Sequence, residues 1–194
     1  MNSIPQNIVK TQGAVFREDR ERLLNQTAST IWITGLSASG KSTIAYALER
    51  ALFDKGRLCY VLDGDNVRHG LNCNLGFSAE DRTENIRRVA EVAKLMNDAG
   101  VIVITAFISP FAKDRELARD AIGTETFKEI YLNTPIETCE GRDPKGLYRK
   151  ARAGEIKDFT GVQSPYEAPE FPSLVIDTSR CHIDEAVQRI LLQL

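Results

Sequence analysis

The chain alternates short apolar runs with longer amphipathic segments. The runs are rich in Val and Ile and are nearly continuous in apolar residues, with little alternation between apolar and polar positions. Strands buried on both faces have this composition, as in a parallel sheet covered by helices. We therefore expect buried strands at residues 30–34, 58–62, 101–107, 129–132 and 174–176.

Two of the intervening segments carry helix boundary signals. Residues 41–55 end at Gly56 and residues 79–99 end at Gly100, and a glycine is well placed there as a C-terminal cap. Ser78, with Asp81 three positions later, has the pattern of an N-terminal cap for the second helix. Alternation of strands with helices predicts an α/β fold.

The segment from residue 142 to about residue 172 breaks this alternation. It is polar, basic and interrupted by Gly and Pro, and a loop of that length inside a compact domain is usually functional. We interpret it as a mobile lid. A chain of 194 residues, 42% of them hydrophobic, suits one domain, so we expect an N-terminal extension over residues 1–29 and a single domain over residues 30–194.

Composition and charge exclude several classes of protein. A formal net charge of −2 argues against a nucleic-acid partner. The four cysteines form no CxxC pair and there are only two histidines, so we expect reduced thiols and no structural zinc. We see neither a secretory signal nor an apolar stretch approaching the ~20 residues of a membrane span, so we expect a cytoplasmic protein without a membrane partner.

A phosphate-binding motif lies between the first expected strand and the first expected helix. Residues 35–42 read GLSASGKS, a full match to G-x-x-x-x-G-K-[ST] in the strand–loop–helix context that it requires. Glycines let backbone N–H groups turn inward toward phosphate oxygens, and the helix N-terminus adds its dipole. We expect Lys41 to reach the β- and γ-phosphates and the Ser42 hydroxyl to ligate Mg²⁺. The predicted ATP-binding residues are Gly35, Leu36, Ser37, Ala38, Ser39, Gly40, Lys41, Ser42 and Thr43.

A phosphate loop alone does not choose between a kinase, a switch and a motor. The chain has no N-K-x-D sequence, which a GTPase uses to read guanine, and neither of its D-x-x-G matches, at residues 120–123 and 143–146, directly follows an expected strand. Asp63 ends the second apolar run in the sequence DGDN, at the carboxyl edge where open α/β sheets bind ligands. It could hold Mg²⁺ through water or accept a proton from an acceptor hydroxyl, although Asp-Gly is also common in ordinary turns. Asp177 is a weaker second candidate, because the residues after it resemble an ordinary strand exit.

Arginines gather downstream of Asp63. Arg suits bidentate recognition of phosphate or sulfate, and Arg68 and Arg82 flank a turn that carries Phe77. Taken singly, each arginine is more often a solvated surface charge, and Arg68 and Arg82 are the better candidates. Pairing with a glutamate on the same helix could account for Arg87 and Arg88.

Four sequence blocks extend over nearly the whole chain from residue 31 onward: GLSASGKS; DGDNVRHGL running into LGFSAEDRTENIRR; TAFISPF; and RDPKGLYRKARAGEIKDFTG followed by PYEAPE. Together they resemble the adenylyl-sulfate (APS) kinase family. This resemblance implies transfer of the ATP γ-phosphoryl group to the 3′-hydroxyl of adenosine 5′-phosphosulfate (APS), giving 3′-phosphoadenosine 5′-phosphosulfate and ADP in sulfate assimilation. It also implies a five-stranded parallel P-loop core, commonly assembled as a homodimer, and it makes a sulfurylase a candidate partner.

The resemblance implies a role for individual residues on both sides of the transferred group. Asp63 would be the catalytic carboxylate near Mg²⁺ and the acceptor hydroxyl, acting with Lys41 and with Ser109 of the ISP triplet. Members of the family have been described with a phosphoserine at that serine, but in-line transfer between two bound substrates needs no such step.

The remaining implied residues bind APS. Phe77 and Phe159 would hold its adenine between two rings, and base–aromatic stacking contributes ~1–3 kcal/mol per base. Lys145 would lie between the two nucleotides, with other basic lid residues bringing positive charge to the transferring phosphoryl group. The implied APS-binding residues are Asp65, Arg68, Phe77, Arg82, Asn85, Ile108, Ser109, Lys145 and Phe159.

Two positions depart from the family pattern. Lys10-Thr11 stands where many members have Trp-His, and Gln163 stands where an Asp is frequent. Two other functions remain open: a P-loop kinase for another small hydroxylated substrate, such as a nucleoside or sugar acid, and a nucleotide-binding regulatory module without turnover. The arginine pair and the two phenylalanines favour an anionic acceptor that contains a base, and the intact phosphate loop and Asp63 argue against loss of turnover.

Overall fold

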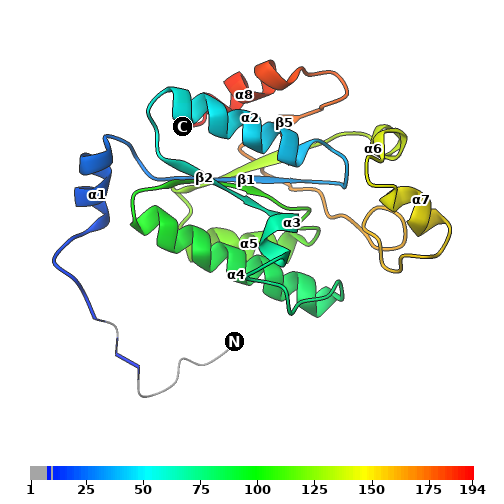
Figure 1. The fold of residues 1–194 in the computed structure, drawn as a ribbon, viewed down its shortest axis with the longest axis horizontal. Coiled ribbons are helices and arrows are strands. Elements are labelled where there is room, and N and C mark those ends of the chain that lie inside the picture. Colours follow the sequence, from blue (N-terminus) through cyan, green and yellow to red (C-terminus); the bar gives the residue numbers. More distant parts are fainter. Residues whose placement is uncertain (1–7, 10) are drawn as a thin grey trace.

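A five-stranded parallel sheet forms the centre of the computed structural model, which describes residues 8, 9 and 11–194 (Figure 1). The strand order is β2-β3-β1-β4-β5, so β1 is the central strand and β2 and β5 are the edges. This confirms the predicted α/β class and the parallel five-stranded core. The strands are β1 (Thr30–Gly35), β2 (Cys59–Asp63), β3 (Ile102–Ala106), β4 (Phe127–Leu132) and β5 (Leu174–Ile176).

Helices cover both faces of the sheet. Helices α2 and α8 lie on one face and α4 and α5 on the other (Figure 1). Two separate apolar cores result, one between the sheet and the α2–α8 pair and the other around Trp32 beneath α4 and α5. The helices are α1 (Arg17–Leu24), α2 (Lys41–Asp54), α3 (Gly64–Arg68), α4 (Ala79–Asp98), α5 (Ala112–Ile122), α6 (Ile136–Arg142), α7 (Leu147–Arg152) and α8 (Ile183–Leu191).

The apolar runs mark the strands to within two residues. All six residues of β1 and all five of β3 are buried, which explains why these runs show no in–out alternation. The predicted caps of α4 are also confirmed. The Ser78 hydroxyl accepts a 3.1 Å hydrogen bond from the backbone of Asp81, and Gly100, just beyond the helix, has φ +85°.

Part of the expected N-terminal extension is docked on the domain. The Arg17 guanidinium of α1 donates a 2.7 Å hydrogen bond to the carbonyl of Ala28, and Arg20 donates one of 2.9 Å to the carbonyl of Asp98 at the end of α4. Residues 1–7 and Lys10, one of the two departures from the family pattern, lie outside the described residues.

The segment predicted as a lid is not loop throughout, because α7 and most of a small apolar core lie within it. Cys139, Tyr148, Ala151 and Phe159 are buried together in this core. The sequence pattern does not indicate this core, because its apolar residues are interspersed with basic ones. That the segment moves stays a prediction. In the part of the chain that the structure describes, no helix has the length and apolar character needed to cross a bilayer.

Candidate active site

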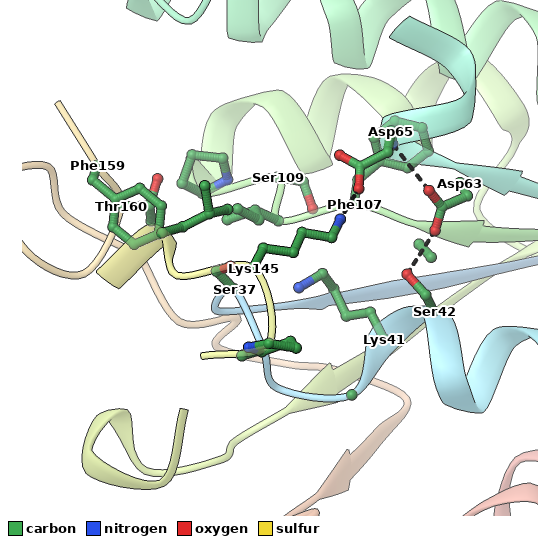
Figure 2. Close-up of a pocket in the computed structure, with 18 of the residues that line it drawn as sticks. Ser37, Lys41, Ser42, Asp63, Asp65, Phe107, Ser109, Lys145, Phe159 and Thr160 are labelled. Atoms are coloured by element: carbon green, nitrogen blue, oxygen red, sulfur yellow. Dashed lines mark hydrogen bonds and ion pairs between the residues drawn. The ribbon is translucent and has the colours of Figure 1, made fainter. Parts of the chain in front are cut away.

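A cavity of about 1220 Å³ opens at the carboxyl edge of the sheet (Figure 2). Its walls come from the phosphate loop after β1, the turn after β2, the segment after β3, the first turns of α4 and the lid. Since all five strands are parallel, their carboxyl ends meet at this one edge, where open α/β sheets bind ligands.

The phosphate loop turns tightly between β1 and α2. A Cβ atom at Gly35 would come within 2.9 Å of the Leu132 carbonyl oxygen, so only glycine fits where the loop leaves the sheet. Gly40 has φ +96° and caps the N-terminus of α2, leaving the first N–H groups of the helix directed at the cavity. Such an array of N–H groups binds phosphate.

Lys41 is the buried cation of this loop. Its ammonium donates hydrogen bonds to the carbonyls of Gly35, at 3.0 Å, and Leu36, at 2.6 Å. Burial lowers its pKa from 10.5 to about 8, an effect that the negative charge of Asp63 partly opposes. A phosphate group brought into the cavity would stabilise the charged form.

Asp63 lies at the end of β2 and is buried. Its Oδ2 accepts a 2.6 Å hydrogen bond from the Ser42 hydroxyl, and its Oδ1 accepts one of 2.9 Å from the backbone of Asp65, which caps α3 (Figure 2). Gly64 beside it leaves little room for a side chain, because a Cβ atom there would lie 3.3 Å from the Phe107 ring. The hydroxyl and carboxylate of Ser42 and Asp63 are hard oxygen donors, and they fit the ligand preference of Mg²⁺.

Ser109 follows β3 and is 2% exposed. Its hydroxyl accepts a 3.1 Å hydrogen bond from the indole N–H of Trp32 and donates one of 3.0 Å to the Thr34 hydroxyl. Tyr166, from the end of the lid segment, shares a 2.9 Å hydrogen bond with the same Thr34 hydroxyl. Both hydrogen-bonding directions of Ser109 are therefore engaged by buried side chains.

The two predicted arginines lie on the same wall of the cavity as Phe77. The Arg68 guanidinium lies over the Phe77 ring, 4.6 Å from its centroid, and donates to the carbonyl of Gly76 at 2.8 Å. Arg82 donates to the Phe77 carbonyl at 2.9 Å and also reaches the lid, at the Thr160 hydroxyl and the Asp158 carbonyl.

The lid contributes a cation and an aromatic ring. Lys145 forms an ion pair with Asp65 across the cavity, and its ammonium points into the same space as that of Lys41 (Figure 2). Phe159 is mostly buried, and its ring packs edge-to-face on Tyr148 at a centroid distance of 5.0 Å.

The structure brings sixteen of the nineteen predicted site residues to the wall of this cavity; the exceptions are Gly35, Leu36 and Ser39, which form the inner side of the phosphate loop. Arg87, Arg88 and Asp177 make the ordinary structural contacts that the sequence suggested for them. Arg87 and Arg88 pair with Glu84, at 2.7 Å and 2.8 Å, on the outer face of α4. Asp177 accepts hydrogen bonds from the backbone and hydroxyl of Ser179, as in an ordinary turn.

Sequence reasoning missed several contributors to the site. Thr160 and Ile86 line the cavity, and Tyr148 lies directly beneath Phe159. These are additional to Arg142 and the Asp177–Thr178 region, which their sequence positions alone suggest for the ATP adenine; Arg142 and Thr178, joined by a 2.8 Å hydrogen bond, line the end of the cavity nearest Ala38. Neither the spacing of Tyr148 and Phe159 nor a motif in this basic segment signals an apolar core there.

The fold and the cavity together define a P-loop kinase. The sequence profile of the adenylylsulphate kinase family matches residues 27–177, and the chain belongs to this family. It is 57% identical over 191 residues to the adenylyl-sulfate kinase of Clostridium kluyveri, covering 98% of this chain and 96% of that protein.

Two solved structures extend the comparison. The Mycobacterium tuberculosis APS kinase in complex with AMPPNP and APS is similar with a TM-score of 0.82 and 50% identity, over 86% of this chain and 97% of that one. A hexameric APS kinase from Thiobacillus denitrificans has a TM-score of 0.65 and 35% identity, over 91% of this chain and 31% of that one.

Proposed function

We propose that this chain transfers the γ-phosphoryl group of ATP to the 3′-hydroxyl of APS. Membership of the adenylyl-sulfate kinase family makes it an ATP-using kinase of that class. The observation that carries the residue assignment is the convergence of the Ser42–Asp63 pair, the two arginines and the two phenylalanines on one cavity. A cavity with a phosphate loop at one end and Arg and Phe side chains at the other suits two nucleotides placed phosphate to hydroxyl.

The donor end binds the ATP phosphates. The N–H groups of the phosphate loop and the Lys41 ammonium hold the β- and γ-phosphates, and Ser42 with Asp63 would hold Mg²⁺. When bound, Mg²⁺ neutralises charge that develops on the phosphate oxygens. Arg142 and Thr178 border this end of the cavity, and we assign the adenine of ATP to their side.

The acceptor end binds APS. Arg68 and Arg82 supply guanidinium donors for the phosphosulfate, with Asn85 beside them, and Phe77 and Phe159 stack on its adenine. Ile108 and Asp65 complete this end of the cavity.

Asp63 acts at the junction of the two ends. Its carboxylate is fixed by Ser42 and by the α3 backbone, so it can accept the proton of the 3′-hydroxyl as the oxygen attacks the γ-phosphorus. Lys41 and Lys145 place positive charge around the transferring group. Ser109 positions the segment after β3, since its hydroxyl already bonds Trp32 and Thr34, and transfer proceeds without a phosphoserine.

The assembly and location belong to the same proposal. We assign the protein to the cytoplasm as a homodimer, with the hexameric T. denitrificans enzyme as the alternative assembly, and sedimentation at several concentrations decides between them. A sulfurylase is the partner that would supply APS.

The test is ADP release from MgATP with and without APS, with chromatographic identification of the nucleotide product. We expect ADP to form only with APS, in amounts equal to a 3′-phosphorylated product. A 3′-deoxy analogue of APS should bind and give no product. If APS stimulates nothing, the phosphate loop assignment stands and the acceptor assignment falls, and nucleosides and sugar acids become the candidates.

A further inference from the structure

The small core of the lid is shared with the phosphate loop. Cys139, Tyr148, Ala151 and Phe159 form its buried centre, and Leu36 and Ala38 of the phosphate loop pack against it. The contact is tight, because a Cβ atom at Gly161 in the lid would lie 3.0 Å from the Leu36 side chain. The lid therefore packs directly on the loop that holds the donor phosphates.

Tyr148 is the residue that contacts both binding ends. Its hydroxyl donates a 3.2 Å hydrogen bond to the carbonyl of Ser37, within the phosphate loop. Its ring packs edge-to-face against Phe159, with centroids 5.0 Å apart and an interplanar angle of 77°. The side chain is 2% exposed and does not line the cavity, so it contacts neither substrate directly.

Local hydrogen bonds hold Tyr148 and Phe159 in one unit. The Asp143 carboxylate accepts the backbone N–H groups of Tyr148 and Arg149, each at 3.1 Å, and fixes the start of α7. The Gln163 side chain accepts the backbone N–H of Phe159 at 3.1 Å and donates to the Ala151 carbonyl at 2.8 Å, which ties Phe159 to the end of α7. A carboxylate side chain at this position could not make the second bond, because it has no N–H group to donate.

We propose that Tyr148 is a positioning residue that couples the ATP end of the cavity to the APS end. Phosphates bound in the loop fix the Ser37 carbonyl, which fixes the Tyr148 hydroxyl and, through its ring, the face of Phe159 that the acceptor adenine stacks on. Coupling between two sites is reciprocal, so bound APS strengthens nucleotide binding by the same factor. The inference rests on the proposed function, because it takes Phe159 as the acceptor contact.

The test is a binding cycle on wild-type protein and on Tyr148→Phe, which keeps the ring and removes only the hydroxyl. APS affinity is measured by calorimetry with and without saturating AMPPNP, and the ratio of the two Kd values is the coupling factor. We expect AMPPNP to tighten APS binding about fivefold or more in the wild type, and Tyr148→Phe to bring this ratio close to one. Tyr60→Phe on the exposed edge strand β2 is the matched control, and it should keep the wild-type ratio.

A second measurement does not depend on APS. Amide hydrogen exchange of residues 147–163 should slow when AMPPNP alone binds the wild type, and should slow much less in Tyr148→Phe at equal nucleotide saturation. A ratio unchanged by Tyr148→Phe, or equal slowing in both proteins, overturns the proposal. If the wild type binds both ligands but the ratio of its two APS Kd values is near one, the coupling proposal is overturned and the proposed function is unaffected. If AMPPNP binds but APS does not in either state, the proposed function fails, and the coupling proposal fails with it.

Discussion

Ser42 and Asp63 lie 21 positions apart on different elements, yet the Ser42 hydroxyl donates a 2.6 Å hydrogen bond to the Asp63 carboxylate. The contact joins the first turn of α2 to the end of the edge strand β2, beside β3 in the sheet. It places the two candidate metal ligands of the chain at one point of the cavity, next to the N-terminus of a helix. The arrangement supports the proposed role of Asp63 as the proton acceptor.

Replacing Asp63 with Asn removes the proton acceptor and keeps the size of the side chain. We expect kcat to fall at least ~100-fold, because positioned general bases contribute about 10²–10⁴ in rate. Affinity for ATP in the absence of metal should change less than about threefold, since the phosphate loop is unaltered. The measurement is steady-state turnover combined with nucleotide titration.

Asp177→Asn is the matched control for this prediction. Asp177 also follows a strand of the sheet, but its carboxylate is engaged by Ser179 in a turn. Its substitution should leave kcat within about threefold of the wild-type value. If Asp177→Asn were the more damaging change, Asp63 would lose its assigned role.

The strands and the donor end of the site could be predicted from the sequence because both depend on local patterns. Buried parallel strands are continuous apolar runs, and the phosphate loop is a contiguous motif whose glycines the backbone itself requires. The Ser42–Asp63 contact needed one further rule, that parallel strands end at a common edge.

The interior of the lid could not be predicted in this way. Tyr148 and Phe159 are eleven positions apart with four basic residues among those between them, and neither periodicity nor a motif indicates that their rings meet. The same holds for the Thr34 hydroxyl, which brings Ser109 and Tyr166 together from segments 57 positions apart through tertiary packing alone. At the acceptor end, residue chemistry alone indicates the pair Arg68 and Arg82, whereas the roles of the other residues there come from family resemblance, which carries information that a single sequence lacks.

Lys145→Met tests the lid cation. The Lys145–Asp65 pair is well exposed, with side-chain exposures of 62% and 66%, so it contributes little to stability and the thermal midpoint should not change. Activity should respond, because the ammonium points into the cavity beside Lys41. We expect kcat/KM for APS to fall about tenfold or more.

Lys150→Met, on the short helix α7 that begins two residues after Lys145, is the comparison for Lys145→Met. Lys150 is exposed and is not part of the cavity wall, so kcat/KM should stay within about twofold. If kcat/KM fell equally in the two variants, the cause would be the total charge of the lid and not a specific role of Lys145 in the cavity.

We expect the ion pairs of Glu84 to stabilise the protein less at acidic pH than at neutral pH. Hydrogen bonds from Arg87 and then Arg88 lower its pKa from 4.5 to about 2. A carboxyl group whose pKa is lowered by folding contributes its full stability at pH values above its unfolded-state pKa. This contribution is lost as the pH falls from about 4.5 toward 2. Because the side chain is a third exposed, we expect Glu84→Gln to cost only ~1 kcal/mol at pH 7.

Urea unfolding between pH 7 and pH 3 measures this difference. The gap in the free energy of unfolding between wild type and Glu84→Gln should be constant down to about pH 5 and then narrow. Glu91→Gln, an exposed position on the same helix, should show a smaller gap at every pH. A Glu84→Gln gap that widens on acidification would contradict the assignment.

The Arg115–Glu129 pair beneath the segment after β3 predicts a much larger effect. Both side chains are buried, and Glu129 accepts hydrogen bonds from Arg115 at 2.8 Å and from Arg119 at 2.6 Å. Glu129→Leu leaves the Arg115 guanidinium buried without its carboxylate, so we expect a loss of ~3–5 kcal/mol in the free energy of unfolding. Glu125→Leu, at an exposed position two residues before β4, should change it by less than about 0.5 kcal/mol.

Because Arg115 also donates a 2.7 Å hydrogen bond to the Ser109 carbonyl, KM for APS should rise in Glu129→Leu even where the protein remains folded. A cost below ~1 kcal/mol would place the pair with ordinary surface ion pairs and remove its role in holding the acceptor end of the cavity.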